Sequence, residues 1–498
     1  SRAPDLLGRR QLTAGAVDLA AAGVADGRGD ALGLQPAHEL ALVGGVGGGP
    51  LRPGRGVERD QVDVHPAPVA VRLQDVAEQV GAQPRDEAVS PVGGNEPQVL
   101  VNQACRDIQA GRNAVVLITG AETWRTRTRL RANGVKPDWT RQDESVPVPP
   151  GAQDAVPMAS PADERIGLDR PVFVYPMFEQ ALRIAAGEEP DEHRRRIGEL
   201  WARFSAVAAA NPHAWSTEAL SAEQIWRPGP DNRMISWPYT KLMNSNNMVD
   251  QGAALILTSV QKATELGVPG ERWVFPYAGT DAHDTYAIGE RAEFFTSPAI
   301  RIAGRRALEL AGFGIDDMAL VDLYSCFPCA VQVAANELGL PTDDPQRPLT
   351  VTGGLTFAGG PWNNYVTHSI ATMAERLTAE PGRLGLISAN GGYLTKHSFG
   401  VYGTEPPPHE FRWEDVQNEV DRQPARTCVV QWSGIGTVET WTTPFNREGK
   451  PEKAFLAVRT PDDARALAVL HEDVAATVRD DIAGAKVRVH DDGTAVLV

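Results

Sequence analysis

The feature that most constrains the fold is an alternation of apolar strand patterns and amphipathic helix patterns along residues 89–404. The clearest strand patterns are AVVLITG, AALILTS, MALVDLY and RLGLISA, and helical patterns lie between them. This alternation is typical of layered α/β folds with a largely buried sheet. Because these runs are apolar throughout, we expect strands that are covered on both faces, as parallel sheets require.

Two helices are well defined by their sequence signals. Asn95 and Gln98 have the spacing of a capping box at a helix start, and Gly111 suits the position just after a helix end. The run PDEHRRRIGELWARFSAVAAANP predicts a second helix, inside a segment rich in Arg, Asp, Glu and Pro. We interpret that segment, residues 125–235, as an insertion of loops and helices.

The domain boundaries follow from these patterns and from shifts in composition. The C-terminal strands are short and separated by turn signals, which predicts a small β module. The expected parts are an anomalous N-terminal segment (1–88), two α/β halves (89–265, containing the insertion, and 266–404), a charged linker (405–425) and the β module (426–498).

The N-terminal segment has an unusual composition. Residues 1–94 contain no Ile, Lys, Asn, Phe, Tyr, Trp, Met or Cys, and residues 41–60 have the pattern of a loop. Two explanations compete: a natural low-complexity arm, or GC-rich DNA translated in the wrong frame or strand, with the true protein beginning near Val89. Peptides from residues 10–80 of the natural protein would exclude mistranslation.

The composition excludes several classes of function. A net charge of −16 and a pI near 5.2 argue against nucleic acid as a partner. No run of about 18 apolar residues predicts a membrane span, and no signal peptide is visible. Four cysteines are too few for a disulfide framework. We therefore expect a cytoplasmic protein without nucleic-acid or membrane partners.

Cys326 and Cys329 follow the strand pattern MALVDLY and precede a helical run that stops at Gly339. Cys326 at the start of that helix is a candidate nucleophile, since a helix N-terminus favours a thiolate. The alternative is a small apolar residue that fills a tight turn. The C-x-x-C spacing also raises zinc and redox hypotheses, but no second ligand pair accompanies it, so we expect no metal.

Four blocks of the chain together carry a family resemblance. VNQACRDIQAGRNAVVLITGAET, YTKLMNSNNMVDQGAALILTS, VDLYSCF and GGLTFAGGP resemble, in this order, conserved blocks of the thiolase superfamily, closest to its sterol-carrier-type branch. The C-terminal β module resembles the OB-fold domains of some thiolase-like proteins. The resemblance implies a five-layered αβαβα core with a small OB-like β-barrel, and coenzyme A or acyl-CoA as substrate or ligand without a covalently bound cofactor.

The resemblance also implies a catalytic set that this chain lacks. Thiolases use a nucleophilic cysteine, an activating histidine and a second cysteine that moves a proton. By family spacing these positions fall on Gly94, Gly360 and either Ala389 or Asn390, and Tyr324 replaces a further histidine. Standard thiolase chemistry is therefore in doubt.

Several residues remain as candidates for a remodelled site. Cys326 with His397 would restore a nucleophile and a base, and His368 is a second candidate base. Glycine-rich loops and their neighbours would hold the thioester: Gly359, Gly360, Asn390, Gly391, Gly392 and Tyr324. An arginine cluster at residues 125–131 would meet the phosphates of coenzyme A or form a solvated face.

Three functional hypotheses stay open. The first is an acyltransferase of acyl-CoA thioesters, in the manner of an acetyl-CoA acetyltransferase of lipid metabolism, with Cys326 and His397 as its catalytic residues. The second is a catalytically silent protein that binds CoA or acyl-CoA or acts as a scaffold. The third, weaker hypothesis is a thioesterase. A homodimer, or a partner protein bound through the C-terminal module, is also expected.

Overall fold

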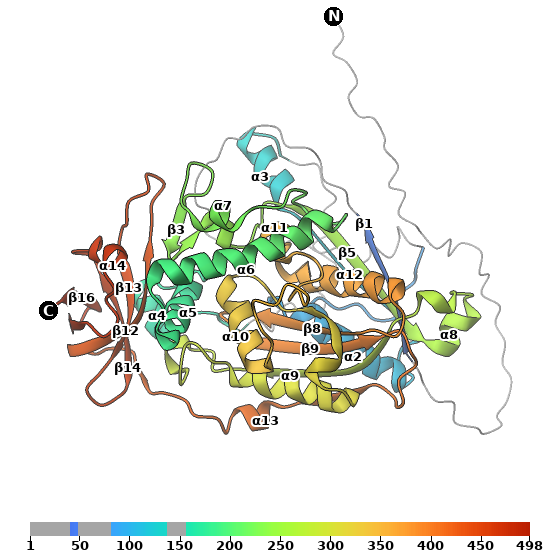
Figure 1. The fold of residues 1–498 in the computed structure, drawn as a ribbon. Coiled ribbons are helices and arrows are strands. Elements are labelled where there is room, and N and C mark those ends of the chain that lie inside the picture. The colour runs from blue at the N-terminus through green and yellow to red at the C-terminus, as the bar shows by residue number, and fades with distance from the viewer. Residues whose placement is uncertain (1–39, 48–80, 137–155) are drawn as a thin grey trace, which may run out of the picture.

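The computed structural model describes residues 40–47, 81–136 and 156–498 of the 498-residue chain. Two sheets form its core (Figure 1). The larger has the strand order β10-β6-β9-β8-β7 and the smaller the order β1-β5-β2. Their strands are β1 (Leu40–Gly47), β2 (Val115–Thr123), β5 (Asp250–Ser259), β6 (Phe275–His283), β7 (Met318–Asp322), β8 (Leu384–Gly391), β9 (Lys396–Gly403) and β10 (Arg412–Asp415).

Two helices lie between the sheets, because α2 (Glu96–Gln109) and α12 (Tyr365–Ala379) each contact strands of both. The predicted end of α2 is confirmed, since Gly111 follows it with a φ of +69°, which favours glycine. The predicted capping box is wrong: Asn95 stands at the N-cap position, but its side chain makes no capping hydrogen bond. Instead it donates to the Glu96 carboxylate.

The smaller sheet differs from the prediction in two ways. Its strands pair antiparallel, and one face of β2 is open, with Val115 and Leu117 more than 40% exposed. The expectation of a parallel strand covered on both faces is therefore wrong for β2. Residues 40–47, expected in a loop, form β1 against β5, because the run LALVGGV is apolar enough to extend a sheet.

The outer face of the larger sheet is covered by α9 (Pro298–Ala311), against which α10 (Pro328–Leu338) packs. The predicted helix–strand–helix order of α9, β7 and α10 is confirmed, as is the stop at Gly339, with a φ of +76°. After β5 the predicted helix is also present, as α8 (Val260–Glu265).

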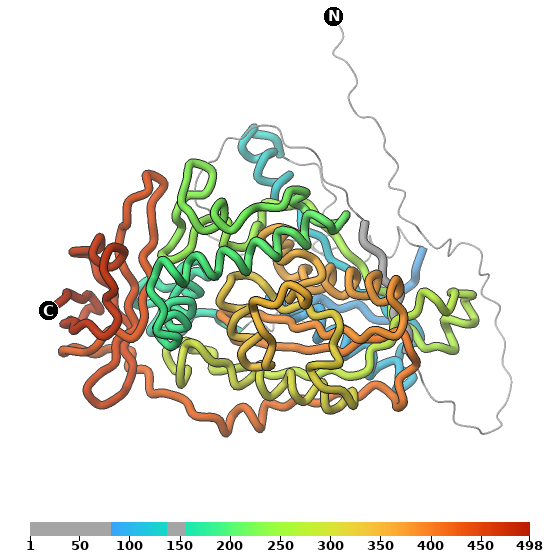
Figure 2. The backbone as a smooth tube through the Cα atoms, in the orientation of Figure 1, coloured from blue at the N-terminus to red at the C-terminus, as the bar shows by residue number. Residues whose placement is uncertain are grey.

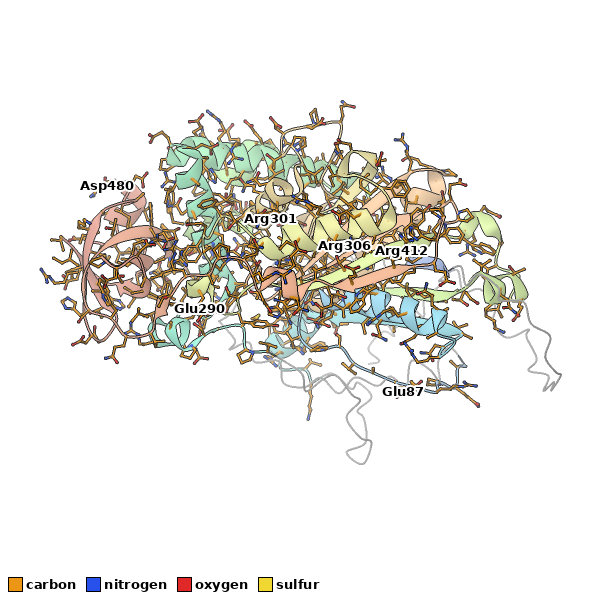
Figure 3. All side chains as sticks on the ribbon, turned by 90° about the horizontal axis from the view of Figure 1, so that it is seen from below. Glu87, Glu290, Arg301, Arg306, Arg412 and Asp480 are labelled. Atoms are coloured by element: carbon orange, nitrogen blue, oxygen red, sulfur yellow. The ribbon has the colours of Figure 1, made fainter. Side chains whose placement is uncertain are left out.

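The segment 405–425 is more than the linker we expected. It supplies β10, which pairs in parallel with β6, and the short helix α13 (Gln417–Val420). Arg306 of α9 donates two hydrogen bonds to Glu414, both 2.7 Å long. Figure 3 labels Arg306 on α9 and Arg412 at the start of β10. The sequence RWED is too charged to predict this strand, in which Glu414 faces α9 while Trp413, on the other side, donates to Asp281 and lies against Arg106 of α2.

The expected insertion contains mainly helices, and the predicted long helix is present as α6. The elements of this region are α3 (Trp124–Ala132), α4 (Pro161–Ile166), α5 (Pro171–Ala186), α6 (Pro190–Ala210), α7 (Ala222–Trp226), β3 (Met234–Trp237) and β4 (Tyr239–Thr240). Figure 1 shows α6 running across the molecule above α10. The short helix α11 (Gly354–Phe357) also packs against α6.

The C-terminal strands close into a five-stranded barrel, in the ring β12-β13-β14-β16-β15. The elements are β11 (Cys428–Val429), β12 (Gly434–Pro444), β13 (Ala454–Arg459), β14 (Arg465–Leu470), α14 (Ala476–Arg479), β15 (Lys486–Val489) and β16 (Thr494–Leu497). Figure 2 shows this barrel at one end of the molecule, against the helices of the insertion.

The barrel is joined to the rest of the protein by backbone pairing and by a buried charge. Strand β12 pairs antiparallel with β3 of the insertion. The fully buried Arg465 binds the Glu439 carboxylate at 2.6 and 2.7 Å, and also donates to carbonyls of residues 289–292. The barrel is therefore packed against the insertion and the α/β core.

Most of the expected N-terminal segment, residues 1–39 and 48–80, lies outside the described residues, so the two explanations of its composition stay open. Among the residues that are described, the structure contains no helix with the length and apolar character needed to cross a membrane.

Candidate active site

Five of the predicted site residues lie at or just beyond the carboxyl ends of β7 and β8, where α/β folds place their ligands: Tyr324, Cys326 and residues 390–392. Asp322, the last residue of β7, is buried and accepts hydrogen bonds from Thr350, Val351 and Thr352. These bonds fix the segment that leads into α11 and the glycine loop. Tyr324 and Cys326 follow directly, and α10 begins at Pro328.

The expected nucleophile position, Gly94, has no room for a side chain. A Cβ atom at residue 94 would lie 2.5 Å from the carbonyl oxygen of Asn390 and would also collide with the phenol oxygen of Tyr324. Tyr324 is buried, and burial raises its pKa, so its hydroxyl stays neutral. The tyrosine therefore fills the space that a side chain at residue 94 would need, the position at which the family resemblance implies the nucleophile.

Cys326 lies in a buried turn, as the sequence predicts. Its sulfur is 3.7 Å from the Asn390 Nδ2 atom, and its carbonyl accepts a hydrogen bond from Ser245. Burial raises the pKa of Cys326 to about 12, because it outweighs the lowering effect of the neighbouring Tyr175 and Asn390 side chains. At pH 7 only on the order of one thiol in 100,000 would be ionised, so Cys326 is a weak nucleophile in this environment.

No pattern in the sequence points to Tyr175, which lies on α5 and reaches the site. Its hydroxyl donates to the carbonyl of Gly392 and accepts from Asn390 and from the backbone of Leu394. Its ring stacks on Phe327 at 4.4 Å. Tyr175 thereby fastens the turn after β8 to the turn after β7. Only its place in a helix packed over α10 reveals this role.

A buried charged group beside the site was also missed. The Glu179 carboxylate accepts hydrogen bonds from His193, Tyr239 and Gln332 at 2.6 to 2.7 Å. Burial opposes its ionisation, but these bonds and the charge of His193 outweigh it, so the pKa of Glu179 lies below its usual value. Tyr239 in turn accepts from the backbone N–H of Cys329. Cys329 is fully buried, in agreement with a packing role.

The side chain of His397 faces Asp284 and not Cys326. Its Nε2 atom lies 3.2 Å from the carbonyl of Leu394 and 3.5 Å from the carboxylate of Asp284. Burial opposes ionisation of Asp284, but Arg291, His397 and Ser297 outweigh it and lower its pKa to about 2. Among the described residues no hydrogen bond joins His397 to Cys326.

His368 is buried in α12 and lies 3.4 Å from the side-chain nitrogen of Asn364. Burial, and to a smaller degree the charge of His213, lower its pKa to about 4. Asn364 donates to the carbonyl of Gly120 on β2. His368 is therefore a neutral group in the layer between the sheets, and the structure does not pair it with a nucleophile among the described residues.

The glycine loop approaches its neighbours closely. A Cβ at Gly360, the expected histidine position, would lie 2.8 Å from the Asn247 side chain, and one at Gly359 would collide with Gln251. The N–H of Gly360 donates to the carbonyl of Asn246. The loop is thus built around asparagine and glutamine side chains where the family carries a histidine.

The second loop leaves one polar atom without a partner. Asn390 is 4% exposed, and among the described residues its Oδ1 atom accepts no hydrogen bond. Gly392 has a φ of +69°, and its neighbour Gly391 accepts from the Thr395 backbone. Asn390 Oδ1 is one of several buried polar atoms around this site without a hydrogen-bond partner among the described residues; Ser325 Oγ and Gln251 Oε1 are two others.

The geometry therefore brings Cys326, Tyr324 and Asn390 together but keeps His397 and His368 in separate surroundings. A neutral phenol can donate a hydrogen bond to a carbonyl oxygen. Covalent acyl transfer needs in addition an ionised nucleophile or an adjacent base. The contacts of Cys326 supply neither among the described residues.

Comparison with known proteins agrees with the fold. A family model described as the additional C-terminal domain of thiolase-like protein type 1 matches residues 415–494. The crystal structure of a monomeric SCP2-thiolase like protein type 1 from Mycobacterium smegmatis is 35% identical to this chain, with a TM-score of 0.73. The match covers 85% of this chain and 87% of that one.

Curated relatives are more distant. Acetyl-CoA acetyltransferase of Methanothermobacter thermautotrophicus is 24% identical over 41% of this chain and 54% of its own length. The enzyme of the same name from Syntrophomonas wolfei is 29% identical over 29% of this chain and 34% of its own length. The chain therefore spans about half or less of the curated relatives that it matches.

The predicted fold class, a thiolase-like layered α/β core with a small C-terminal β-barrel, is confirmed by the closed barrel and by the match to the mycobacterial structure. At 35% identity over 87% of the mycobacterial protein, this chain belongs to the family of SCP2-thiolase-like proteins of type 1.

Proposed function

We propose that this protein binds a coenzyme A thioester without forming an acyl-enzyme. The observation that carries the proposal is the phenol of Tyr324, whose oxygen fills the space that a side chain at residue 94 would need. The buried thiol of Cys326, with its pKa raised to about 12, supports the same conclusion. Thioester binding itself is an expectation from the thiolase-like fold.

In this proposal the site recognises the thioester carbonyl through hydrogen bonds. The neutral hydroxyl of Tyr324 donates to the carbonyl oxygen, and the glycine loops let the ligand approach the backbone. The free Oδ1 atom of Asn390 accepts a hydrogen bond from an N–H or O–H of the ligand. Recruitment of a partner protein through the barrel stays a prediction, as does homodimerisation.

Titration calorimetry with acetyl-CoA and with free CoA tests this function. We expect saturable binding of both ligands. Tyr324→Phe should lower the affinity for acetyl-CoA by roughly three- to tenfold, the usual net contribution of one hydrogen bond. Because free CoA has no thioester carbonyl, its affinity for the same variant should hardly change.

A thiol assay on the same samples tests whether the protein instead cleaves acetyl-CoA. Steady release of free CoA from acetyl-CoA, abolished by Cys326→Ala, would restore the acyltransferase or thioesterase hypothesis. Absence of binding for either ligand would favour the scaffold hypothesis.

A further inference from the structure

A cavity of about 410 Å³, away from Tyr324 and Cys326, opens where three segments distant in sequence meet. It lies between the last two turns of α6, the loop of residues 345–351 and the C-terminal half of α12. Of the residues named for the thiolase-like site above, only Val351, whose backbone N–H donates to Asp322, lines it. A volume of this size is in the range of small-molecule sites.

The walls of this cavity are mainly apolar. Ala206, Val207 and Ala210 lie on one side of α6 and face Pro348 and Val351 across the cavity. Alanines at two of these helical positions leave space that larger side chains would fill. The surface suits the apolar body of a ligand, because its burial against such walls removes apolar area from water.

Arg203 supplies a charge without a counter-ion. Its guanidinium donates to the carbonyl of Thr342, and no carboxylate among the described residues lies within ion-pair distance of it. Burial lowers its pKa, and Asp343 and Glu199 raise it only from farther away. A guanidinium has five N–H donors in a planar fork, so one backbone carbonyl leaves most of them free.

The other charged groups of the cavity already have partners. Glu375 lies 3.2 Å from His213, and Arg376 lies 3.7 Å from Glu380. The carbonyl end of α6, near Ala210, carries a partial negative charge and disfavours an anion there. An anionic group is therefore favoured at Arg203, with the apolar part of the ligand toward Ala210.

We propose that this cavity binds a small carboxylate with an apolar body. The carboxylate pairs with Arg203 in the two-bond geometry that guanidinium and carboxylate groups share. The apolar body lies along Ala206, Val207 and Ala210. This site is independent of thioester recognition at Tyr324, and either can fail without the other.

Calorimetry of the full chain with octanoate tests the proposal. We expect saturable binding that Arg203→Gln weakens by about tenfold or more, since a charged hydrogen-bonded pair is lost. Ala210→Trp, which fills the cavity, should abolish binding. Arg195→Gln removes an exposed arginine of the same helix outside the cavity and should leave the affinity unchanged.

Two further measurements make the outcome decisive. Octan-1-ol, which has the apolar body without the charge, should bind more weakly than octanoate and be insensitive to Arg203→Gln. Thermal unfolding of each variant without ligand confirms that it is folded. Octanoate that does not bind the wild type, or binds Arg203→Gln and Ala210→Trp as tightly as the wild type, would overturn the proposal.

Discussion

The replacement of a reactive thiol by a phenol can be tested at single residues. Gly94→Ala places a Cβ against the Tyr324 hydroxyl and the Asn390 carbonyl, so we expect it to lower the free energy of unfolding by about 1–3 kcal/mol, the usual cost of overpacking. Tyr324→Phe removes only the hydroxyl and should recover part of that loss in the double variant. Denaturant unfolding of the four proteins measures the coupling; strictly additive effects would contradict the contact.

His368 gives the protein a dependence on pH that one substitution can isolate. Its pKa of about 4 lies below the ordinary 6.5, so the unfolded chain binds its proton first as the pH falls. Stability should therefore decrease between about pH 6.5 and pH 4, by on the order of 3 kcal/mol at most for this group. His368→Phe should flatten that part of the curve in urea unfolding. An unchanged slope would show that His368 does not stay neutral in the fold.

At the scale of elements, the Glu179 carboxylate holds α5, α6, β4 and α10 together. Glu179→Gln removes the fully buried carboxylate from His193 and leaves it only the partly exposed Glu188, so we expect a loss of about 3 kcal/mol in stability. Glu192→Gln, on the exposed side of α6, is a matched control that should change stability by less than about 0.5 kcal/mol. Equal effects of the two substitutions in urea unfolding would refute this role.

The elements also show what the sequence can predict. Periodicity was sufficient for α6 and α9, because each buries one apolar face, whereas α10 is buried on nearly all sides and was found from its apolar run and the stop at Gly339. Family spacing predicts the positions of the thiolase catalytic residues, among them residue 94, and this assignment stays a prediction. Tyr175 could not be found in this way, because a residue some 150 positions from Cys326 reaches the site only through the packing of α5 on α10.

At the scale of the whole molecule, the barrel should unfold together with the core. Arg465→Gln would leave Glu439 with a weakened partner and free the carbonyls of residues 289–292, at a cost of about 3–5 kcal/mol. We expect calorimetry to show one transition for the wild type and a separate, earlier barrel transition for the variant. The control Arg488→Gln, at an exposed position of β15, should behave as the wild type. Two transitions in the wild type would show that the barrel and the core do not unfold together.

The central claim is that the thiolase-like site binds a thioester without accepting its acyl group. Intact-protein mass spectrometry after incubation with acetyl-CoA, followed by peptide mapping, tests it most directly. We predict that the mass stays unchanged and that Cys326 is recovered as a free thiol. One acetyl group on Cys326 would contradict the claim and establish a relocated nucleophile.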